Sequence, residues 1–172
     1  MKKAMIMNTH SDNLYTPNVA VYPLLKYLPP IAYEDSESNY TIWECTDYGQ
    51  SKITSCLKEI GYKVISTDIT TGFDFLNDKP DFNFDIIITN PPFSLKDDFF
   101  QKCYEYKKPF ALLLPLTALE GIRRGKMYKE FGISVIVLDK RINYMDKKGN
   151  WQNTSWFVWN IIPNNRLTFE SL

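Results

Sequence analysis

The sequence predicts an α/β fold with a seven-stranded, mostly parallel sheet, one antiparallel strand, and helices on both faces. Segments typical of strands alternate with segments typical of helices from residue 40 to residue 139, as in parallel sheets. Residues 84–89 are apolar and rich in β-branched side chains, as in a strand buried on both faces. A polar loop without a helix joins the last two strands, so one of them should run antiparallel.

Length and composition favour one globular unit. The 172 residues are expected to form a single domain with a sizeable core, preceded by an N-terminal arm over residues 1–13. No apolar run reaches the roughly 18 residues of a membrane-spanning helix, so we expect a cytoplasmic protein. Cys45, Cys56 and Cys103, with His10 as the single histidine, match neither a disulfide framework nor a metal site. We therefore expect buried thiols and no metal.

A helix, a loop and a strand are expected first. Thr16 and Pro17 are typical of an N-cap and a first helical position, and apolar residues follow at helical spacing. Residues 29–40 contain two prolines and several acids and predict an exposed loop. Residues 40–45 predict the first core strand.

A strand, turn, helix and second strand follow in the order typical of dinucleotide-binding folds. The turn contains Gly49, the helix extends over residues 53–60 to a C-cap at Gly61, and the second strand ends at Asp68. A carboxylate at that position can accept hydrogen bonds from two adjacent ribose hydroxyls. We therefore expect Asp68 to bind a cofactor of that kind.

The remaining elements lead into and out of the buried strand at residues 84–89. Residues 71–76 fit a short third strand. Beyond the buried strand, helices are predicted over 97–106 and 119–131, strands over 109–115, 133–138 and 154–161, a polar loop over 144–153, and a short tail after Pro163.

The buried strand runs directly into Asn90-Pro91-Pro92-Phe93. Open α/β sheets bind ligands at the carboxyl ends of their strands. Two prolines stiffen the backbone and leave its carbonyls free to accept hydrogen bonds. Asn90 and the Pro91 carbonyl would thus form a rigid acceptor corner beside an aromatic ring, suited to a planar group with an NH₂. A plain turn at the end of a strand is the alternative.

Asn-Pro-Pro-Phe after an apolar strand resembles the catalytic motif of S-adenosylmethionine-dependent amino-methyltransferases, above all the compact, phage-borne type of adenine-specific DNA methyltransferase. The resemblance covers residues 15–161 and implies a Rossmann-like methyltransferase fold. It implies that Asn90 and the Pro91 carbonyl accept the two hydrogens of an adenine amine, that Pro92 keeps them rigid, and that Phe93 stacks on the base. The base would be flipped out of a duplex or already single-stranded.

The same resemblance implies a set of residues that bind S-adenosylmethionine. They are Tyr15, Thr16, Glu44, Cys45, Gly49, Asp68, Ile69, Asp74, Phe75 and Asn90. For Asp74 the alternative is a helix N-cap. The sequence departs from the family's glycine-rich loop, because Gly49 comes one residue late and Ser51 replaces the second glycine. Serine fits there only if its φ is negative.

Charge is unevenly distributed along the chain. Residues 1–101 carry 8 Lys and Arg against 14 Asp and Glu, and residues 102–148 carry 11 against 5. This split suits a protein that meets a polyanion on one face, although a solvated helix face is the alternative. The candidates for nucleic-acid contact are Arg123, Arg124, Lys126, Lys140, Arg141, Lys147, Lys148 and Trp151. Trp151 is either a base wedge or a loop anchor.

Three functions fit these residues. The first is methylation of the adenine amine in DNA, with no separate domain for reading a target sequence and with a homodimer as one possible assembly. The second is methylation of a protein glutamine amide or of an RNA base amine. The third is a non-catalytic module that retains the fold, which the altered glycine loop suggests and which Asn90 and Asp68 argue against.

Overall fold

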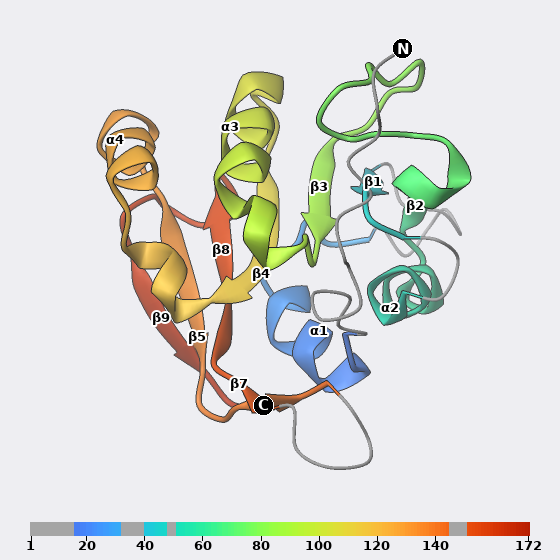
Figure 1. Cartoon of the computed structure of the whole chain (residues 1–172). Helices are drawn as coiled ribbons and strands as arrows, with labels where there is room; N and C mark the ends of the chain where they lie inside the picture. Colours follow the sequence, from blue (N-terminus) through green and yellow to red (C-terminus); the bar gives the residue numbers. More distant parts are fainter. Residues whose placement is uncertain (1–15, 32–39, 48–50, 145–150) are drawn as a thin grey trace.

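The computed structural model describes residues 16–31, 40–47, 51–144 and 151–172. Within this part of the chain a seven-stranded sheet forms the centre of the molecule (Figure 1). From one edge to the other its strands are β2 (Lys63–Ser66), β1 (Thr41–Glu44), β3 (Ile86–Thr89), β4 (Phe110–Pro115), β8 (Thr154–Trp159), β5 (Ser134–Leu138) and β9 (Leu167–Glu170).

The strand directions confirm the predicted fold class. β2, β1, β3 and β4 pair in parallel, as do β5 and β9. β8 pairs antiparallel with both β4 and β5 and lies between them. The antiparallel strand is therefore one of the two that the helix-free loop connects, as predicted.

Two of the predicted strand assignments are wrong. Residues 71–76 form no strand. Instead Asp68 caps a short 3₁₀ helix, Ile69–Thr71, which ends at Gly72 with a φ of 96°. The seventh strand is β9, formed by the tail that was expected only to be short. Ser134 fixes this tail, because its hydroxyl donates to the Pro163 carbonyl at 2.8 Å and accepts from the Arg166 amide at 3.0 Å.

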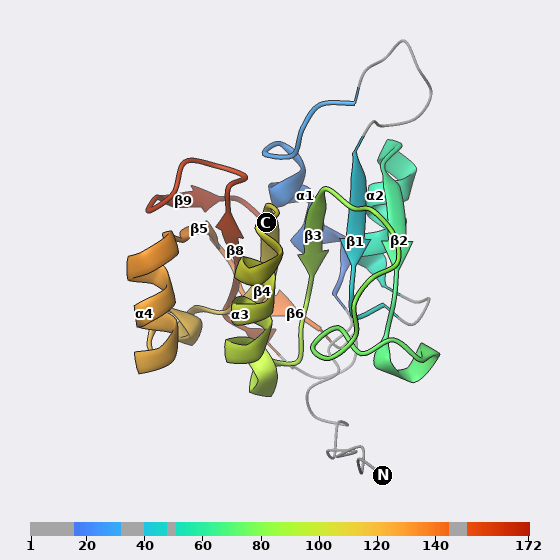
Figure 2. The same ribbon diagram turned by 90° about the horizontal axis from the view of Figure 1, so that it is seen from above.

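Two helices cover each face of the sheet (Figures 1 and 2). α1 (Asn18–Leu25) and α2 (Lys52–Ile60) pack against one face in a cluster that includes Ile42, Ile88 and Trp156. α3 (Lys96–Tyr106) and α4 (Ile122–Phe131) pack on the other face against Trp43, Ile87 and Phe157. Neighbouring residues such as Ile42 and Trp43 point to opposite faces, and both are fully buried, as expected of central strands.

The irregular segment between β2 and β3 covers its part of the sheet with aromatic rings. Phe73, Phe75, Phe82 and Phe84 surround Trp43 with ring centroids 4.8–5.7 Å apart. Burying rings of this size is strongly favourable, and edge-to-face packing adds to it. The aromatic cluster takes the place that a helix would have on this face.

α1 begins one residue later than predicted. Pro17, and not Thr16, is its N-cap, and Pro23 lies inside the helix. A small antiparallel ribbon of β6 (Ile142–Asn143) and β7 (Trp151–Gln152) flanks the part of the predicted polar loop that lies outside the described residues.

Among the described residues, no helix is long and apolar enough to span a bilayer. In the same ranges, no group of three or more His, Cys, Asp and Glu side chains could hold a metal ion.

Candidate active site

The ends of three neighbouring strands bring the central site residues together. β1, β2 and β3 are parallel neighbours, so the residues that follow them lie together along the edge of the sheet formed by the carboxyl ends of its parallel strands. The arrows of these three strands point to that edge in Figure 2. Thr46, Asp68 and Asn90 follow these three strands. The sequence thus places polar groups where an open α/β sheet binds its ligands.

Asn90 is held in place by a threonine from the start of the chain. Its Nδ2 atom donates a hydrogen bond of 3.0 Å to Oγ1 of Thr16. Since Thr16 holds the nitrogen, the side-chain oxygen of Asn90 has a fixed direction. That oxygen is buried in the structure.

The two prolines and Phe93 continue the corner. Pro91 is buried, Pro92 is half-buried, and Phe93 begins a 3₁₀ helix, Phe93–Leu95, that leads into α3. The Pro92 carbonyl accepts from Leu95 N at 3.0 Å, which fixes the chain after the corner. The Phe93 ring is partly exposed and packs against the cluster under α3.

Glu44, at the end of β1, is 1% exposed and accepts hydrogen bonds on both oxygens. Oε1 accepts from Thr46 N at 3.1 Å, from the Thr46 hydroxyl at 3.2 Å and from the Thr89 hydroxyl at 2.5 Å. Oε2 accepts from the Ser51 hydroxyl at 3.1 Å. Glu44 therefore joins the ends of β1 and β3 to the start of α2.

Burial raises the pKa of the Glu44 carboxyl from 4.5 to about 7, against the opposing effect of the Thr89 hydrogen bond. Asp47, the neighbouring carboxylate, raises this pKa further, whereas the Thr46 amide and the Ser51 hydroxyl lower it.

We expect Glu44 to give the stability of the protein a specific pH dependence. Between pH 4.5 and about 7 the folded protein holds a proton on Glu44 that the unfolded chain releases. This stabilisation is fully present below pH 4.5 and is lost as the pH rises through about 7. The loss should reach about 3 kcal/mol. The free energy of unfolding should be measured in urea across this pH range for wild type and Glu44→Gln. The difference between the two proteins should change with pH, because the contributions of the other carboxylates cancel in it. A constant difference would contradict the prediction.

Ser51 fits the position of the second glycine. Its φ is −65°, so serine meets the condition that replacement of the glycine requires. Its hydroxyl accepts from Ile53 N at 3.1 Å and Thr54 N at 3.4 Å and so caps α2. The same hydroxyl donates to Glu44. The serine thus connects the helix start to the carboxylate at the end of β1.

Asp68 is 9% exposed at the end of β2. Its Oδ1 atom accepts from the Thr70 amide at 2.7 Å and from the Thr70 hydroxyl at 2.5 Å. The carboxylate is thereby oriented by the turn that follows β2.

The other predicted cofactor residues in the described part of the chain have varied surroundings. Cys45 is buried under the α3 face, where burial raises the pKa of its thiol. Ile69 is 66% exposed. Phe75 stacks on Phe99 with centroids 4.9 Å apart, inside the aromatic cluster. Asp74 accepts from Leu76 N and Asn77 Nδ2 at 2.9 and 2.7 Å within a turn over residues 75–77, which is not a helix.

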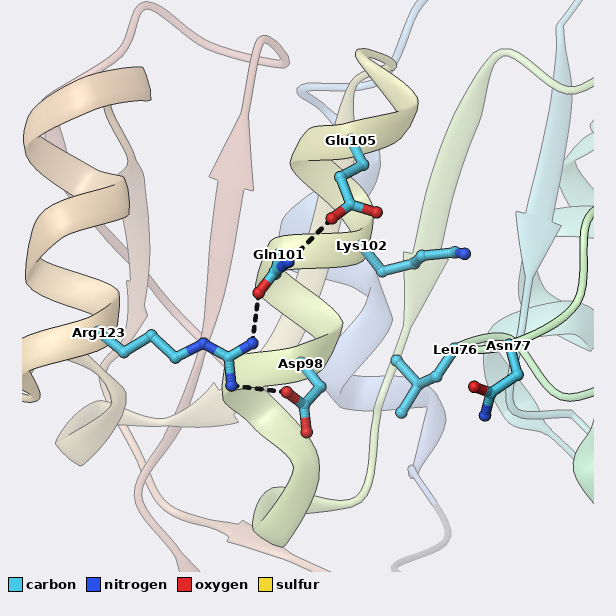
Figure 3. Close-up of a pocket in the computed structure, with 7 residues that line it drawn as sticks. All are labelled: Leu76, Asn77, Asp98, Gln101, Lys102, Glu105 and Arg123. Atoms are coloured by element: carbon cyan, nitrogen blue, oxygen red, sulfur yellow. Dashed lines mark hydrogen bonds and ion pairs between the residues drawn. The ribbon is translucent and has the colours of Figure 1, made fainter. Parts of the chain in front are cut away.

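Of the basic residues predicted to contact nucleic acid, two arginines form ion pairs with residues of α3 and three other residues are exposed. Arg123 donates to Asp98 at 2.6 Å and also to Gln101, beside a groove of about 370 Å³ along α3 (Figure 3). Arg124 is buried and paired with Asp97. Lys126, Lys140 and Arg141 are exposed. The last two follow β5 and therefore lie at the same edge of the sheet as Asn90.

Several predicted residues lie outside the described part of the chain. They are Tyr15, Gly49, Lys147 and Lys148, and the side chain of Trp151 also belongs to this group.

Thr46 and Thr89 are site residues that the sequence analysis missed. Thr46 donates to the Asn90 carbonyl at 3.3 Å, and the hydroxyls of the two threonines lie 2.6 Å apart. Thr89 is fully buried at the end of an otherwise apolar strand. A buried hydroxyl needs a hydrogen-bond partner, so a threonine at the end of an apolar strand indicates a polar group beside it. This was the signal in the sequence that could have identified Thr89.

No known family model matches the sequence, and no protein of curated function matches it. Several solved structures are similar to this one. A type I restriction-modification methyltransferase subunit from Streptococcus thermophilus has a TM-score of 0.59 at 18% identity, over 91% of this chain and 46% of that one. A modification subunit assigned to a type I restriction enzyme of Vibrio vulnificus has a TM-score of 0.59 at 11% identity, over 95% and 48%.

A third similar structure is a Listeria monocytogenes protein assigned to the class I S-adenosylmethionine-dependent methyltransferases. It has a TM-score of 0.55 at 12% identity, over 92% of this chain and 65% of that one. The chain therefore has the Rossmann-like methyltransferase fold. It spans about half the length of the type I subunits that it matches.

Proposed function

We propose that the protein is an S-adenosylmethionine-dependent methyltransferase that acts on the exocyclic amine of adenine in DNA. The observation that carries this proposal is the Asn90 corner at the carboxyl end of β3, one strand away from Glu44 at the end of β1. The methyltransferase fold supports the reaction class.

The described residues fit S-adenosylmethionine at this edge. Asp68 presents a carboxylate after β2, oriented by Thr70, where it would accept from the ribose hydroxyls. Ser51 itself is extended, with the negative φ that a serine in place of the second glycine needs. When bound, the cofactor supplies a methyl group on a sulfonium whose leaving thioether is neutral.

The protein's part in this reaction is positioning. A thioether that leaves without charge needs no general acid, so catalysis depends on aligning the nitrogen with the methyl group. Asn90 Oδ1 and the Pro91 carbonyl would accept hydrogen bonds from the two N–H groups of the amine. These bonds would direct the nitrogen lone pair toward the methyl carbon. Thr16 and the prolines fix these acceptors before the reaction. Phe93, partly exposed, would stack on the base.

DNA is the preferred substrate for two reasons. Lys140 and Arg141 are exposed at the edge that carries Asn90, where they would contact phosphates. Two of the similar structures come from restriction-modification systems. A duplex base cannot enter the corner, so the adenine would be flipped out or single-stranded.

Transfer of labelled methyl from S-adenosylmethionine tests the proposal. The substrates are unmethylated single-stranded and double-stranded DNA, with RNA and a protein extract in parallel. We expect label in DNA, recovered as N6-methyladenine after digestion. Label only in RNA or in glutamine would replace adenine in DNA as the substrate. Absence of both label and cofactor binding would refute the reaction class.

A further inference from the structure

Three hydroxyl groups and one carboxylate form a continuous chain of hydrogen bonds under the Asn90 corner. The chain starts at the Asn90 carbonyl, which lies 3.3 Å from the Thr46 hydroxyl. It continues from Thr46 to Thr89 over 2.6 Å and from Thr89 to Glu44 over 2.5 Å. Ser51 completes it on the other oxygen of Glu44. Residues from β1, β3 and the start of α2 thereby share one network.

The hydrogens in this network have a definite arrangement when Glu44 is ionised. A carboxylate only accepts, so Thr89 must give its single hydrogen to Glu44. In the contact between the two threonines, Thr46 is then the donor. Its single hydrogen is shared among the Thr89 oxygen at 2.6 Å, Glu44 Oε1 at 3.2 Å and the Asn90 carbonyl at 3.3 Å. Hydrogen bonds to an ionised group are shorter and stronger than neutral ones. The bond from Thr89 to Glu44 is therefore the strongest in this network.

We propose that Thr46 and Thr89 are positioning residues, which act through the main chain of Asn90 and are held in turn by Glu44. This inference rests on the proposed function. The peptide between Asn90 and Pro91 carries the Asn90 carbonyl, which Thr46 contacts, and its nitrogen belongs to the ring that fixes φ of Pro91. Thr16 holds the Asn90 side chain by a separate hydrogen bond. The corner is thus fixed at its main chain and at its side chain by separate contacts.

This arrangement also gives Glu44 a role different from the one that the resemblance implied. With 1% exposure and donors from its own chain on both oxygens, Glu44 is placed to organise the site rather than to touch the cofactor. Asp47 is the charged group beside it, and Cys45 is its buried ionisable neighbour.

Thr89→Val tests the proposal, because it removes the hydroxyl and keeps the shape. We expect kcat to fall roughly 10- to 100-fold, as for a small displacement of a reacting group. KM for DNA and Kd for S-adenosylmethionine should stay within about twofold of wild type, since the binding contacts are untouched. Thr89→Ser should restore most of kcat.

Thr54→Val is the matched control. Thr54 is also a buried threonine whose hydroxyl contacts another hydroxyl, that of Ser66 at 3.1 Å, but it joins α2 to β2 and does not contact the corner. Its kcat should equal that of wild type. An unchanged kcat in Thr89→Val, or an equal loss in Thr54→Val, would overturn the proposal. If Thr89→Val does not fold, Thr46→Val provides the same test at a half-buried residue.

A measurement without turnover separates this proposal from the proposed function. The main-chain carbonyl signal of Asn90 in ¹³C NMR spectra of protein labelled at the asparagine carbonyl carbons, assigned by its loss in Asn90→Ala, should shift in Thr89→Val and Thr46→Val but not in Thr54→Val. Wild-type protein that transfers no methyl would refute the function, while these shifts would still support the positioning network. Unchanged Asn90 signals would refute the network whatever the activity.

Discussion

Replacement of Asn90 by alanine is expected to lower kcat by about 10²- to 10³-fold, the usual loss when one fixed hydrogen-bonding group is removed from a reacting centre. The side-chain oxygen accepts one amine hydrogen in the proposed reaction, and alanine offers no acceptor. The bond to Thr16 is lost as well, so the corner also loses its side-chain anchor. Affinity for S-adenosylmethionine should remain largely intact, because Asp68 and the loop before α2 are unchanged.

Single-turnover transfer of labelled methyl measures this loss, and calorimetry measures cofactor binding. Asn90→Asp is the matched variant, since it keeps acceptor oxygens and loses the nitrogen that donates to Thr16. It should retain more activity than Asn90→Ala. Turnover of Asn90→Ala within a factor of about ten of wild type would show that Asn90 does not take part in the transition state.

Replacement of Asp68 by alanine should weaken S-adenosylmethionine binding by on the order of 10²-fold, because hydrogen bonds to a charged group contribute about 1.5–3 kcal/mol each. Asp68 also caps the 3₁₀ helix Ile69–Thr71, so loss of the cap could lower affinity indirectly. Asp68→Asn distinguishes the two effects, since its side-chain oxygen can still accept from Thr70 N.

Titration calorimetry with the cofactor gives the dissociation constants of both variants. If the carboxylate binds the ribose, Asp68→Asn should also bind weakly although its cap is intact. Binding of Asp68→Asn equal to wild type, with only Asp68→Ala impaired, would reduce the role of Asp68 to capping.

The parts of the fold that were predicted correctly depend on local patterns. The β-branched run before Asn90 specified a central strand, and Gly61 specified the end of α2. The lack of a helix between the last two predicted strands indicated the antiparallel β8. Asn90 and Asp68 were found because both directly follow strands, and parallel strands place such residues at one edge.

The parts that could not be predicted depend on contacts distant in sequence. Leu167 and Phe169 alternate with polar residues only briefly, and β9 forms because β5 offers it a free edge. The segment over 71–76 has a pattern compatible with a strand, but Asp68 and Gly72 close a turn there first. The burial of Glu44 depends on Thr89, 45 positions away, which no local pattern could indicate.

The position of β8 determines the order in which the chain can fold. Within the described sheet, β4 and β5 are joined only through β8, although both precede it in the sequence. During synthesis, β1 to β4 can associate early, but β4 and β5 each keep an unpaired edge until Trp159 has emerged from the ribosome. Late completion of the sheet favours slow folding. It also leaves unpaired strand edges that can associate with other chains. We therefore expect the newly made chain to depend on chaperones until residues 154–159 can pair with β4 and β5.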